Sequence, residues 1–294
     1  MSTELSTDQG DRIRTAFESM KDFGTEGVIV FTRESVEIIG QDRAKLVDVR
    51  FSILSSKIRE TGGDYGYAGG EPFIRLGIRT KAVSSALKRF SQGDIVAIGA
   101  NIGNTYELHV SCRSEGRKFV CKLVAPDPLE DLPPTSALRS IKYKGSITMS
   151  STVFHSIIGD LSTSDAEMIE IRCDGRDLKF SAKGLFSKTS VTIQDANVIQ
   201  GLSDNNGQQD SWDVCESFST IHLQRIAKAK NIAPRIIVSI GSNLPAMFEY
   251  ETPIGLLTYL VCPRDKNVFC NSPIGSVQGQ KRPREFCGNE SDDF

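Results

Sequence analysis

Apolar residues recur at helical spacing in four segments of the chain. Each segment follows the i, i+3, i+4, i+7 pattern, which gathers apolar side chains on one face of an α-helix. The first three segments are complete, and the fourth has Lys230 where the next apolar residue would fall. The pattern predicts four short helices, whose apolar positions are Ile13, Ala16, Phe17 and Met20; Val83, Ala86, Leu87 and Phe90; Phe154, Ile157, Ile158 and Leu161; and Leu223, Ile226 and Ala227.

Between these helices, short runs rich in β-branched and aromatic residues predict strands separated by brief turns. The glycine-rich stretch 62–70 lacks the G-x-G-x-x-G spacing and does not lie between a strand and a helix, so we expect a flexible loop there. The predicted strands cover residues 28–31, 36–39, 46–51, 95–98, 106–112, 118–124, 168–173, 178–182, 190–193, 236–240, 247–251 and 256–262.

The order of these elements repeats along the chain. Matching Phe17 to Phe154 and Lys88 to Lys228 gives nearly the same offset, roughly 140 residues, which is typical of a tandem duplication. Each half is predicted to pack two short helices on one face of an antiparallel sheet. The expected fold class is therefore α+β, with two similar domains.

Composition divides the chain into four parts. We expect domains at residues 1–124 and 141–264, a connector at 125–140 and a disordered polar tail at 265–294. The connector is rich in proline, which favours a semi-rigid extended segment. Its Leu129 and Leu132 either form a docking surface or hold the connector against its own sheet.

Net charge and hydropathy exclude several classes of protein. A net charge of −2 excludes a protein that binds nucleic acid through overall basicity, although a local basic strip remains compatible with it. No signal peptide or long apolar run is apparent, so we expect an intracellular protein without a membrane partner. Seven cysteines without C-x-x-C spacing indicate reduced thiols, and we expect no metal site and no cofactor.

Basic residues gather on the polar faces of three predicted helices. Because residues three, four or seven apart share one side of a helix, each group forms a basic face. Such faces suit sequence-independent contact with DNA phosphates, or they are simply solvated surfaces. The third helix differs, since it offers His155, Ser156, Gly159 and Asp160. The candidate DNA-binding residues are Arg14 and Lys21; Lys81, Lys88 and Arg89; and Arg225, Lys228 and Lys230.

No motif points to catalysis. The chain has no phosphate-binding loop, no G-x-S-x-G turn and no H-E-x-x-H zinc motif. Its three histidines, His109, His155 and His222, are far apart in sequence. We therefore predict no catalytic residue and regard an enzyme as a remote alternative.

Several segments together resemble the proliferating cell nuclear antigen family of DNA sliding clamps. Residues 147–184 resemble the start of its second domain, 13–23 its first helix, 76–98 its second helix with the next strand, and 218–240 its final helix. The resemblance covers roughly residues 11–264 and depends on the order of many weak matches rather than on one motif. The chain is identified as a divergent member.

The resemblance implies a ring of three subunits that encircles double-stranded DNA, with helices lining the hole. Such a clamp keeps a DNA polymerase on its template, recruits replication and repair proteins and is opened by a clamp loader. The joining edges would be the strands near 106–113 and 185–193. The pocket for partner peptides would include Leu46, Leu129, Leu132, Pro245, Tyr259 and Pro263.

Departures from the family keep alternatives open. The segment 41–45 is shorter than its counterpart, and the third helix lacks basic residues. A subunit of a heterotrimeric checkpoint-type clamp, or a viral processivity factor that does not encircle DNA, therefore remains an alternative. The tail contains K-R-P-R at 281–284, a pattern found in nuclear import signals, so we expect the nucleus, or a viral replication site if a virus encodes the chain.

Overall fold

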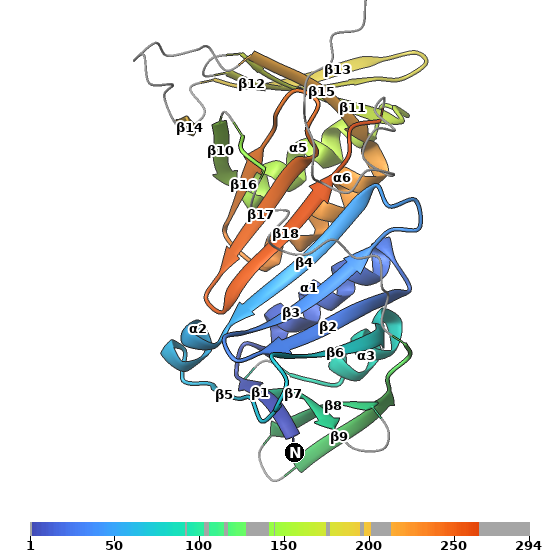
Figure 1. Cartoon of the computed structure of the whole chain (residues 1–294). Helices are drawn as coiled ribbons and strands as arrows, with labels where there is room; N and C mark the ends of the chain where they lie inside the picture. The colour runs from blue at the N-terminus through green and yellow to red at the C-terminus, as the bar shows by residue number, and fades with distance from the viewer. Residues whose placement is uncertain are drawn as a thin grey trace, which may run out of the picture.

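The two halves of the chain are stacked end to end and share one long antiparallel sheet (Figure 1). This computed structural model describes residues 2–91, 93–102, 106–114, 117–127, 141–143, 145–174, 177–194, 197–200 and 213–264. The predicted connector, including Leu129 and Leu132, falls largely outside these residues, as does the tail with its K-R-P-R segment.

Within the described residues, the first half forms nine strands and three helices. Its helices are α1 (Gly10–Phe23), α2 (Ser55–Glu60) and α3 (Thr80–Leu87). Its strands are β1 (Ser2–Thr7), β2 (Glu26–Thr32), β3 (Ser35–Gln41), β4 (Val47–Leu54), β5 (Asp64–Gly66), β6 (Phe73–Arg79), β7 (Ile95–Ile102), β8 (Tyr106–Ser114) and β9 (Arg117–Val124).

The second half repeats this order. Its helices are α5 (Ser151–Ser162), α6 (Thr220–Ala227) and the 3₁₀ turn η1 (Lys228–Asn231). Its strands are β10 (Gly145–Ser150), β11 (Met168–Asp174), β12 (Asp177–Lys183), β13 (Lys188–Ile193), β14 (Asn197–Gln200), β15 (Asp213–Ser219), β16 (Arg235–Ser239), β17 (Ala246–Thr252) and β18 (Gly255–Val261). The four helices and the α+β class predicted from the sequence are confirmed.

Strand order shows the duplication directly. The order β1-β7-β8-β9 in the first half recurs as β10-β16-β17-β18, and β4-β3-β2-β6 recurs as β13-β12-β11-β15. Inside the chain, β18 pairs with β4 in antiparallel register from Val261 opposite Val47 to Gly255 opposite Ile53. This pairing fuses two four-stranded units into the central sheet of nine strands, which also includes β14.

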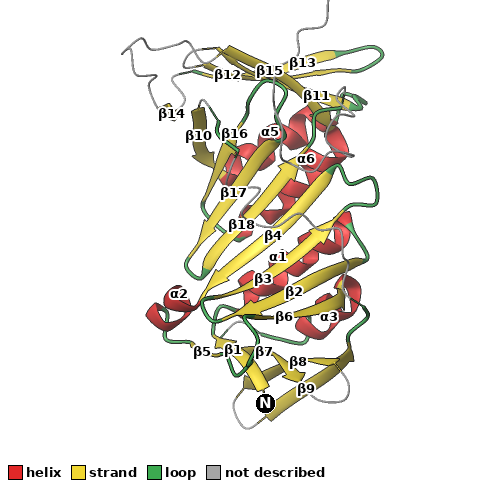
Figure 2. Ribbon diagram, in the orientation of Figure 1, coloured by secondary structure: helices red, strands yellow, loops and turns green. Residues whose placement is uncertain are grey.

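The helices cover one face of the central sheet, and α1, α5 and α6 lie behind the strands in the view of Figure 2. The core between the two layers is built from fully buried aromatic side chains. Phe154 of α5 lies 5.8 Å from Phe248 of β17, measured between ring centroids. The hydroxyl of Tyr250 donates a hydrogen bond of 3.0 Å to the backbone oxygen of Ile226 on α6. The opposite face of the sheet is free of these four helices.

The glycine-rich stretch 62–70 is anchored, which corrects the expectation of a flexible loop. Its residues 64–66 form β5, which pairs with β1. The Tyr65 side chain is buried, and its hydroxyl donates hydrogen bonds to the backbone oxygens of Thr32 and Ser35. Burial raises the pKa of Tyr65 to about 12. The aromatic ring explains the anchor, because the glycines alone would leave the segment without side-chain packing.

Two general features bear on the class of protein. No helix within the described ranges is long and apolar enough to cross a membrane. In the same part of the chain, no three His, Cys, Asp or Glu side chains are grouped as metal ligands would be.

Candidate nucleic-acid interface

The four predicted helices form one continuous layer. The helix α1 packs against α3, α5 packs against α6, and η1 contacts α1, α5 and α6. Each helix turns a buried stripe toward the sheets, as its spacing predicts. The polar faces of all four helices therefore lie on the same side of the molecule.

The charged residues on the polar face of α3 are all basic. Lys81 lies in its first turn and Lys88 directly after its last residue, and both side chains are exposed. The helix itself, Thr80–Leu87, contains no carboxylate. Arg89 is also exposed, and its guanidinium carbon lies 5.0 Å from the centre of the Phe119 ring, a cation–π distance. The face of α3 is the most positive part of the layer.

The polar face of α1 is mixed in charge. Glu18 and Asp22 lie on the same face as Arg14 and Lys21, because residues three, four or seven apart are neighbours on a helix. Arg14 donates a hydrogen bond of 3.3 Å from Nη1 to the backbone oxygen of Phe90, so its side chain leans toward the end of α3. The net positive charge predicted for α1 is therefore partly neutralised.

The basic residues that follow α6 belong to η1. Arg225 lies on α6, with its guanidinium carbon 5.7 Å from the centre of the Phe23 ring. Lys228 forms an ion pair of 2.8 Å with Asp22 of α1. Lys230 is half-buried. Lys228 and Lys230 thus lie on the 3₁₀ turn η1, just after α6 has ended, rather than on α6 itself. The ion pair of Lys228 with Asp22 joins the two halves of the chain.

The polar face of α5 has no basic residue. Its exposed positions include Thr152, Ser156, Gly159 and Asp160. The His155 side chain is only half-exposed, and its Nδ1 lies 3.1 Å from the backbone oxygen of Ala227, a contact that bonds α5 to α6. The helix layer is therefore positive along α3, balanced along α1 and weakly negative along α5.

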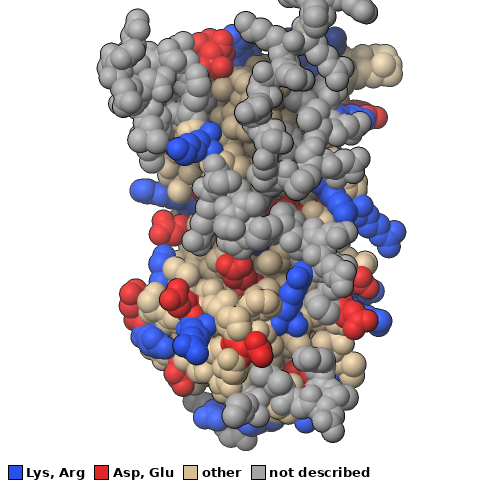
Figure 3. Space-filling model, in the orientation of Figure 1, with Lys and Arg blue, Asp and Glu red and all other residues tan. Residues whose placement is uncertain are grey.

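The opposite, sheet face is different in character. Figure 3 shows this face with acidic and basic side chains interspersed rather than separated. The segment after β9 lies directly against this face at Gly77 of β6. A Cβ added to Gly77 would lie only 2.4 Å from the backbone oxygen of Pro126, so glycine allows the close approach. The connector therefore starts on the sheet face, away from the helices.

Tyr259 does not line a surface pocket. Its side chain is fully buried on the helix face of β18, and its hydroxyl lies 2.6 Å from the hydroxyl of Ser19 on α1. Burial raises the pKa of Tyr259 well above its ordinary value. Side chains alternate along a strand, so the next residue, Leu260, points to the sheet face beside Asp48 and Met247. The sequence analysis missed Leu260.

Three of the other predicted pocket residues lie together around Cys262. The backbone N–H of Cys262 donates a hydrogen bond of 2.9 Å to the backbone oxygen of Leu46, which is half-buried. Pro263 follows directly and is buried, as is Pro245, whose backbone oxygen accepts a hydrogen bond of 2.6 Å from the Tyr143 hydroxyl. Tyr143, close to the end of the connector, is a contact that the sequence analysis missed.

The second half of the chain matches a known protein family. Residues 137–264 match the family described as "Proliferating cell nuclear antigen, C-terminal domain". The second half of the chain is therefore similar to the C-terminal domain of proliferating cell nuclear antigen. The "DNA polymerase sliding clamp" of Nitrosopumilus maritimus is 21% identical over 268 residues, covering 90% of this chain and 99% of the relative.

A second relative and two solved structures are also similar to this chain. The proliferating cell nuclear antigen of Saccharomyces cerevisiae is 23% identical over 127 residues, 43% of this chain and 49% of the relative. The solved structure of the Entamoeba histolytica protein has a TM-score of 0.72 at 17% identity, with 89% of this chain and 98% of that chain covered. A PCNA2–PCNA3 complex from Sulfolobus tokodaii also gives a TM-score of 0.72, at 14% identity, covering 90% and 100%. These two structures share the fold of this chain.

One expectation drawn from the proliferating cell nuclear antigen family is wrong. The strand near 106–113, predicted to join subunits, is β8, and it pairs with β7 on one side and β9 on the other. Its backbone groups are already used in the sheet. Among the described residues, β9 is one edge strand of the first half's outer sheet, and β13, within the predicted range 185–193, is one edge strand of the second half's outer sheet.

Proposed function

We propose that the chain is a subunit of a DNA sliding clamp, a ring that encircles duplex DNA and keeps a polymerase on its template. The observation that supports this most directly is the single helix layer, whose polar face is basic along α3 and η1, set against a sheet face of mixed charge. Attraction to phosphates does not depend on base sequence, so a basic lining holds a duplex loosely and lets it slide.

The internal junction of the chain supplies a template for the ring. In the repeated strand order, β9 takes the place of β18, and β13 takes the place of β4. Since β18 pairs with β4 within the chain, β9 of one copy is expected to pair with β13 of the next. Pairing two exposed edges removes unpaired backbone groups from both strands.

Repeating this contact between identical copies gives a head-to-tail assembly, which closes into a ring when the rotation per subunit suits. We propose a homotrimer, opened and closed by a clamp loader, with its domains at residues 1–124 and 141–264. Topological linkage to DNA needs no catalytic residue and no cofactor. We place such a clamp in the nucleus, or at a viral replication site if a virus encodes it.

We propose that polymerases and other clamp-binding proteins dock on the sheet face. The site would combine Leu46, Pro245, Pro263 and Leu260 with Leu129 and Leu132 of the connector. Leu46 is half-buried, and Pro245, Pro263 and Leu260 are buried beside it. An apolar cluster next to a connector suits a short peptide that inserts one or two anchors. Tyr259 is left out because its side chain lies on the helix face of the sheet, where its hydroxyl contacts Ser19 of α1.

Lys81→Ala combined with Lys88→Ala tests the DNA face. Both side chains are exposed, so the fold should be unchanged, while each subunit loses two positive charges from the hole. We expect clamp-dependent primer extension to become at least about two-fold less processive and the salt dependence of DNA association to become shallower. Unchanged processivity and an unchanged salt slope would show that α3 does not face the duplex.

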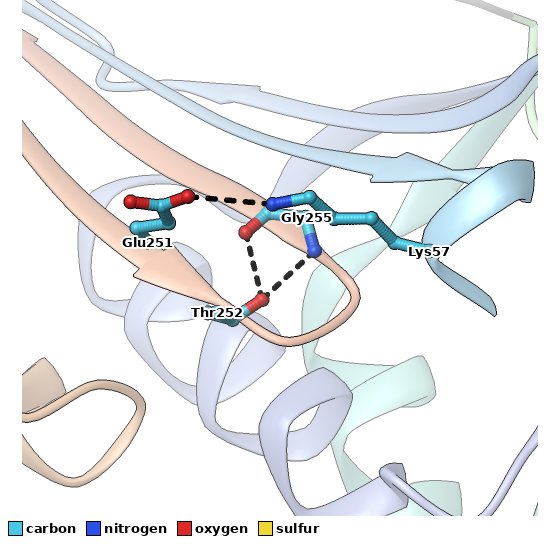
Figure 4. A network of polar contacts seen from close by, with 4 residues as sticks. All are labelled: Lys57, Glu251, Thr252 and Gly255. Carbon is cyan, nitrogen blue, oxygen red and sulfur yellow. Dashed lines mark hydrogen bonds and ion pairs between the residues drawn. The ribbon is translucent and has the colours of Figure 1, made fainter. Parts of the chain in front are cut away.

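The matched control removes two positive charges outside the helix layer. Lys57 and Arg59 lie on α2, at the side of the sheet. Figure 4 shows Lys57 paired with Glu251 of β17. Their charged atoms lie 3.4 Å apart, and such a surface ion pair contributes little to stability. Lys57→Ala with Arg59→Ala should leave processivity and the salt slope as in the unmodified protein.

One observation favours a heteromeric clamp as a second candidate. Transferring the internal register to the seam places Lys122 of β9 opposite Lys188 of β13, and like charges directly opposite are unfavourable. A different subunit with an acidic edge would avoid this. Light scattering separates the two cases: a mass near three chains of 32.2 kDa supports the homotrimer, and a stable monomer supports the alternative.

A further inference from the structure

Two apolar side chains at the end of the molecule are almost wholly exposed. Leu185 is 84% exposed and Phe186 is 96% exposed, in the turn between β12 and β13. Burying a Leu or Phe side chain contributes about 1.5–3 kcal/mol, so an exposed pair of this kind marks a contact surface.

The turn is fixed in position. The N–H of Gly184 donates a hydrogen bond of 2.9 Å to the backbone oxygen of Ser187, which closes the turn. A Cβ on Gly184 would lie 1.8 Å from the backbone oxygen of Ser164, so only glycine allows this close approach. The Ser187 hydroxyl also lies 3.5 Å from the same oxygen. Leu185 and Phe186 are therefore held outward by the residues that follow α5.

An apolar groove lies at the other end of the chain, between α3 and the end of β9. Its volume is about 350 Å³. Val124 at its rim is 83% exposed. The groove is lined mainly by Ile78, Val83, Leu108, Leu123, Val124 and Ala125. It contains enough space for one or two large apolar side chains.

The duplication brings the turn and the groove together. Superposing the hairpin β8–β9 on β17–β18 makes Val124 equivalent to Cys262, and superposing β12–β13 on β3–β4 makes Phe186 equivalent to Leu46. Within the chain, Cys262 and Leu46 are joined by a backbone hydrogen bond, and Leu46 packs against the core. The same register between two copies places Phe186 of one at Val124 of the next.

We propose that Leu185 and Phe186 of one subunit insert into the groove beside Val124 of a second copy of this chain. The occupant is a second copy because one chain presents both complementary apolar parts at strand ends that the internal register brings opposite each other. The proposal rests on the ring assembly proposed above and adds the residues that fix its seam. Each subunit uses its turn on one neighbour and its groove on the other.

Two single variants and their mixture test the proposal. Phe186→Lys spoils the turn and leaves the groove intact, and Val124→Glu does the reverse; both sites are exposed, so unfolding temperatures should stay unchanged. By light scattering over a dilution series, each variant alone should self-associate at least about 30-fold more weakly, since one large apolar side chain leaves the interface. An equimolar mixture should associate more tightly than either variant alone, because a ring of three then has one native junction, one that pairs Lys with Glu and only one that is the same as in a single variant. Ile221→Ser on α6, another exposed apolar position, is the control and should behave as the unmodified protein.

The outcomes separate this inference from the clamp itself. If the unmodified protein assembles and both variants assemble equally well, the seam residues are wrong while the ring stands. If both variants assemble weakly and their mixture associates no more tightly than either alone, the turn and the groove do not meet each other. If the unmodified protein is monomeric throughout, a second copy is not the occupant and the homotrimer fails as well.

Discussion

The hydroxyl groups of Tyr259 and Ser19 form a buried hydrogen bond of 2.6 Å that joins β18 of the second half to α1 of the first. Both residues are buried, so neither hydroxyl has access to solvent as an alternative partner. A buried hydroxyl without a partner costs about 1–3 kcal/mol. This single contact therefore helps to hold the two halves in register.

Tyr259→Phe is expected to lower the free energy of unfolding by about 1–2 kcal/mol, because the Ser19 hydroxyl loses its partner. Urea denaturation followed by circular dichroism measures the change. Tyr67→Phe is the control, since the Tyr67 hydroxyl bonds the backbone oxygen of Glu71 near the surface and its loss should cost less. Equal losses for the two variants would contradict the buried contact.

The sequence alone does not show which of Tyr259 and Leu260 faces the helices and which faces the opposite side of the sheet. The strand containing both reads L-L-T-Y-L-V-C, and apolar residues occupy both of its faces, so alternation does not reveal which one is covered by helices. The long-range pairing with β4, together with Ser19, decides it. Where polar and apolar residues do alternate, as along α3, the sequence placed the exposed lysines on the polar side.

At the scale of elements, the four helices were predictable because each has a continuous apolar stripe. The helix α2 was missed, since its six residues are too few to show periodicity. The edge strand was also assigned wrongly. Strands β8 and β9 look alike in sequence, and only the pairing of β8 with β7 shows that β9 is the outer one.

The proposed seam between β9 and β13 contains an unfavourable charge arrangement. Lys122 would face Lys188, although Glu107 lies 3.7 Å from the Lys122 ammonium group and offsets part of its charge. The equivalent internal pair is Leu260 opposite Asp48, which has no such repulsion. The seam between copies is therefore electrostatically weaker than the junction within a chain.

Lys188→Glu is expected to strengthen self-association by roughly 0.5–1 kcal/mol, a few-fold in dissociation constant, because an opposite-charge pair replaces a like-charge pair. Sedimentation equilibrium at low salt measures it. Added salt should strengthen association of the unmodified protein and weaken that of the variant. Lys183→Glu is the control: Lys183 pairs with Lys188 within the hairpin, so it relieves the same internal repulsion without facing Lys122. If both variants self-associate more tightly by the same amount, Lys188 does not face Lys122 and the proposed pairing of β9 with β13 is wrong.

At the scale of the whole molecule, positive charge is distributed unevenly around the proposed hole. The face of α3 is basic, α1 is balanced, and α5 exposes Asp160 without a basic residue. Three copies would therefore alternate between positive arcs and neutral or weakly negative ones. Such a lining attracts DNA less strongly than a uniformly basic hole and permits faster exchange of phosphate contacts.

Gly159→Lys on α5 is expected to tighten association with duplex DNA, because it adds one positive charge per subunit to the weakest arc. Nothing lies within 4 Å of a Cβ at this position, and replacing a helical glycine also stabilises the helix by about 0.5–1 kcal/mol. Fluorescence anisotropy with labelled duplex at two salt concentrations measures the change. Gly159→Glu has the same helix benefit and the opposite charge, so it should weaken binding. Equal affinities for the two variants would place α5 away from the duplex.

The internal pairing of β18 with β4 has a mechanical consequence for any closed assembly of these chains. That junction is continuous with the core, since Tyr259 and Leu257 on β18 are fully buried, so separating it would unfold part of the subunit. The proposed contact between copies joins the edge strands of two subunits that are already folded, so it can separate without unfolding either one. A ring of three copies would thus have three permanent joints and three openable ones. A duplex without free ends, such as a circle, can enter only through an openable joint, so the rate at which that joint breaks sets how long the clamp remains on DNA.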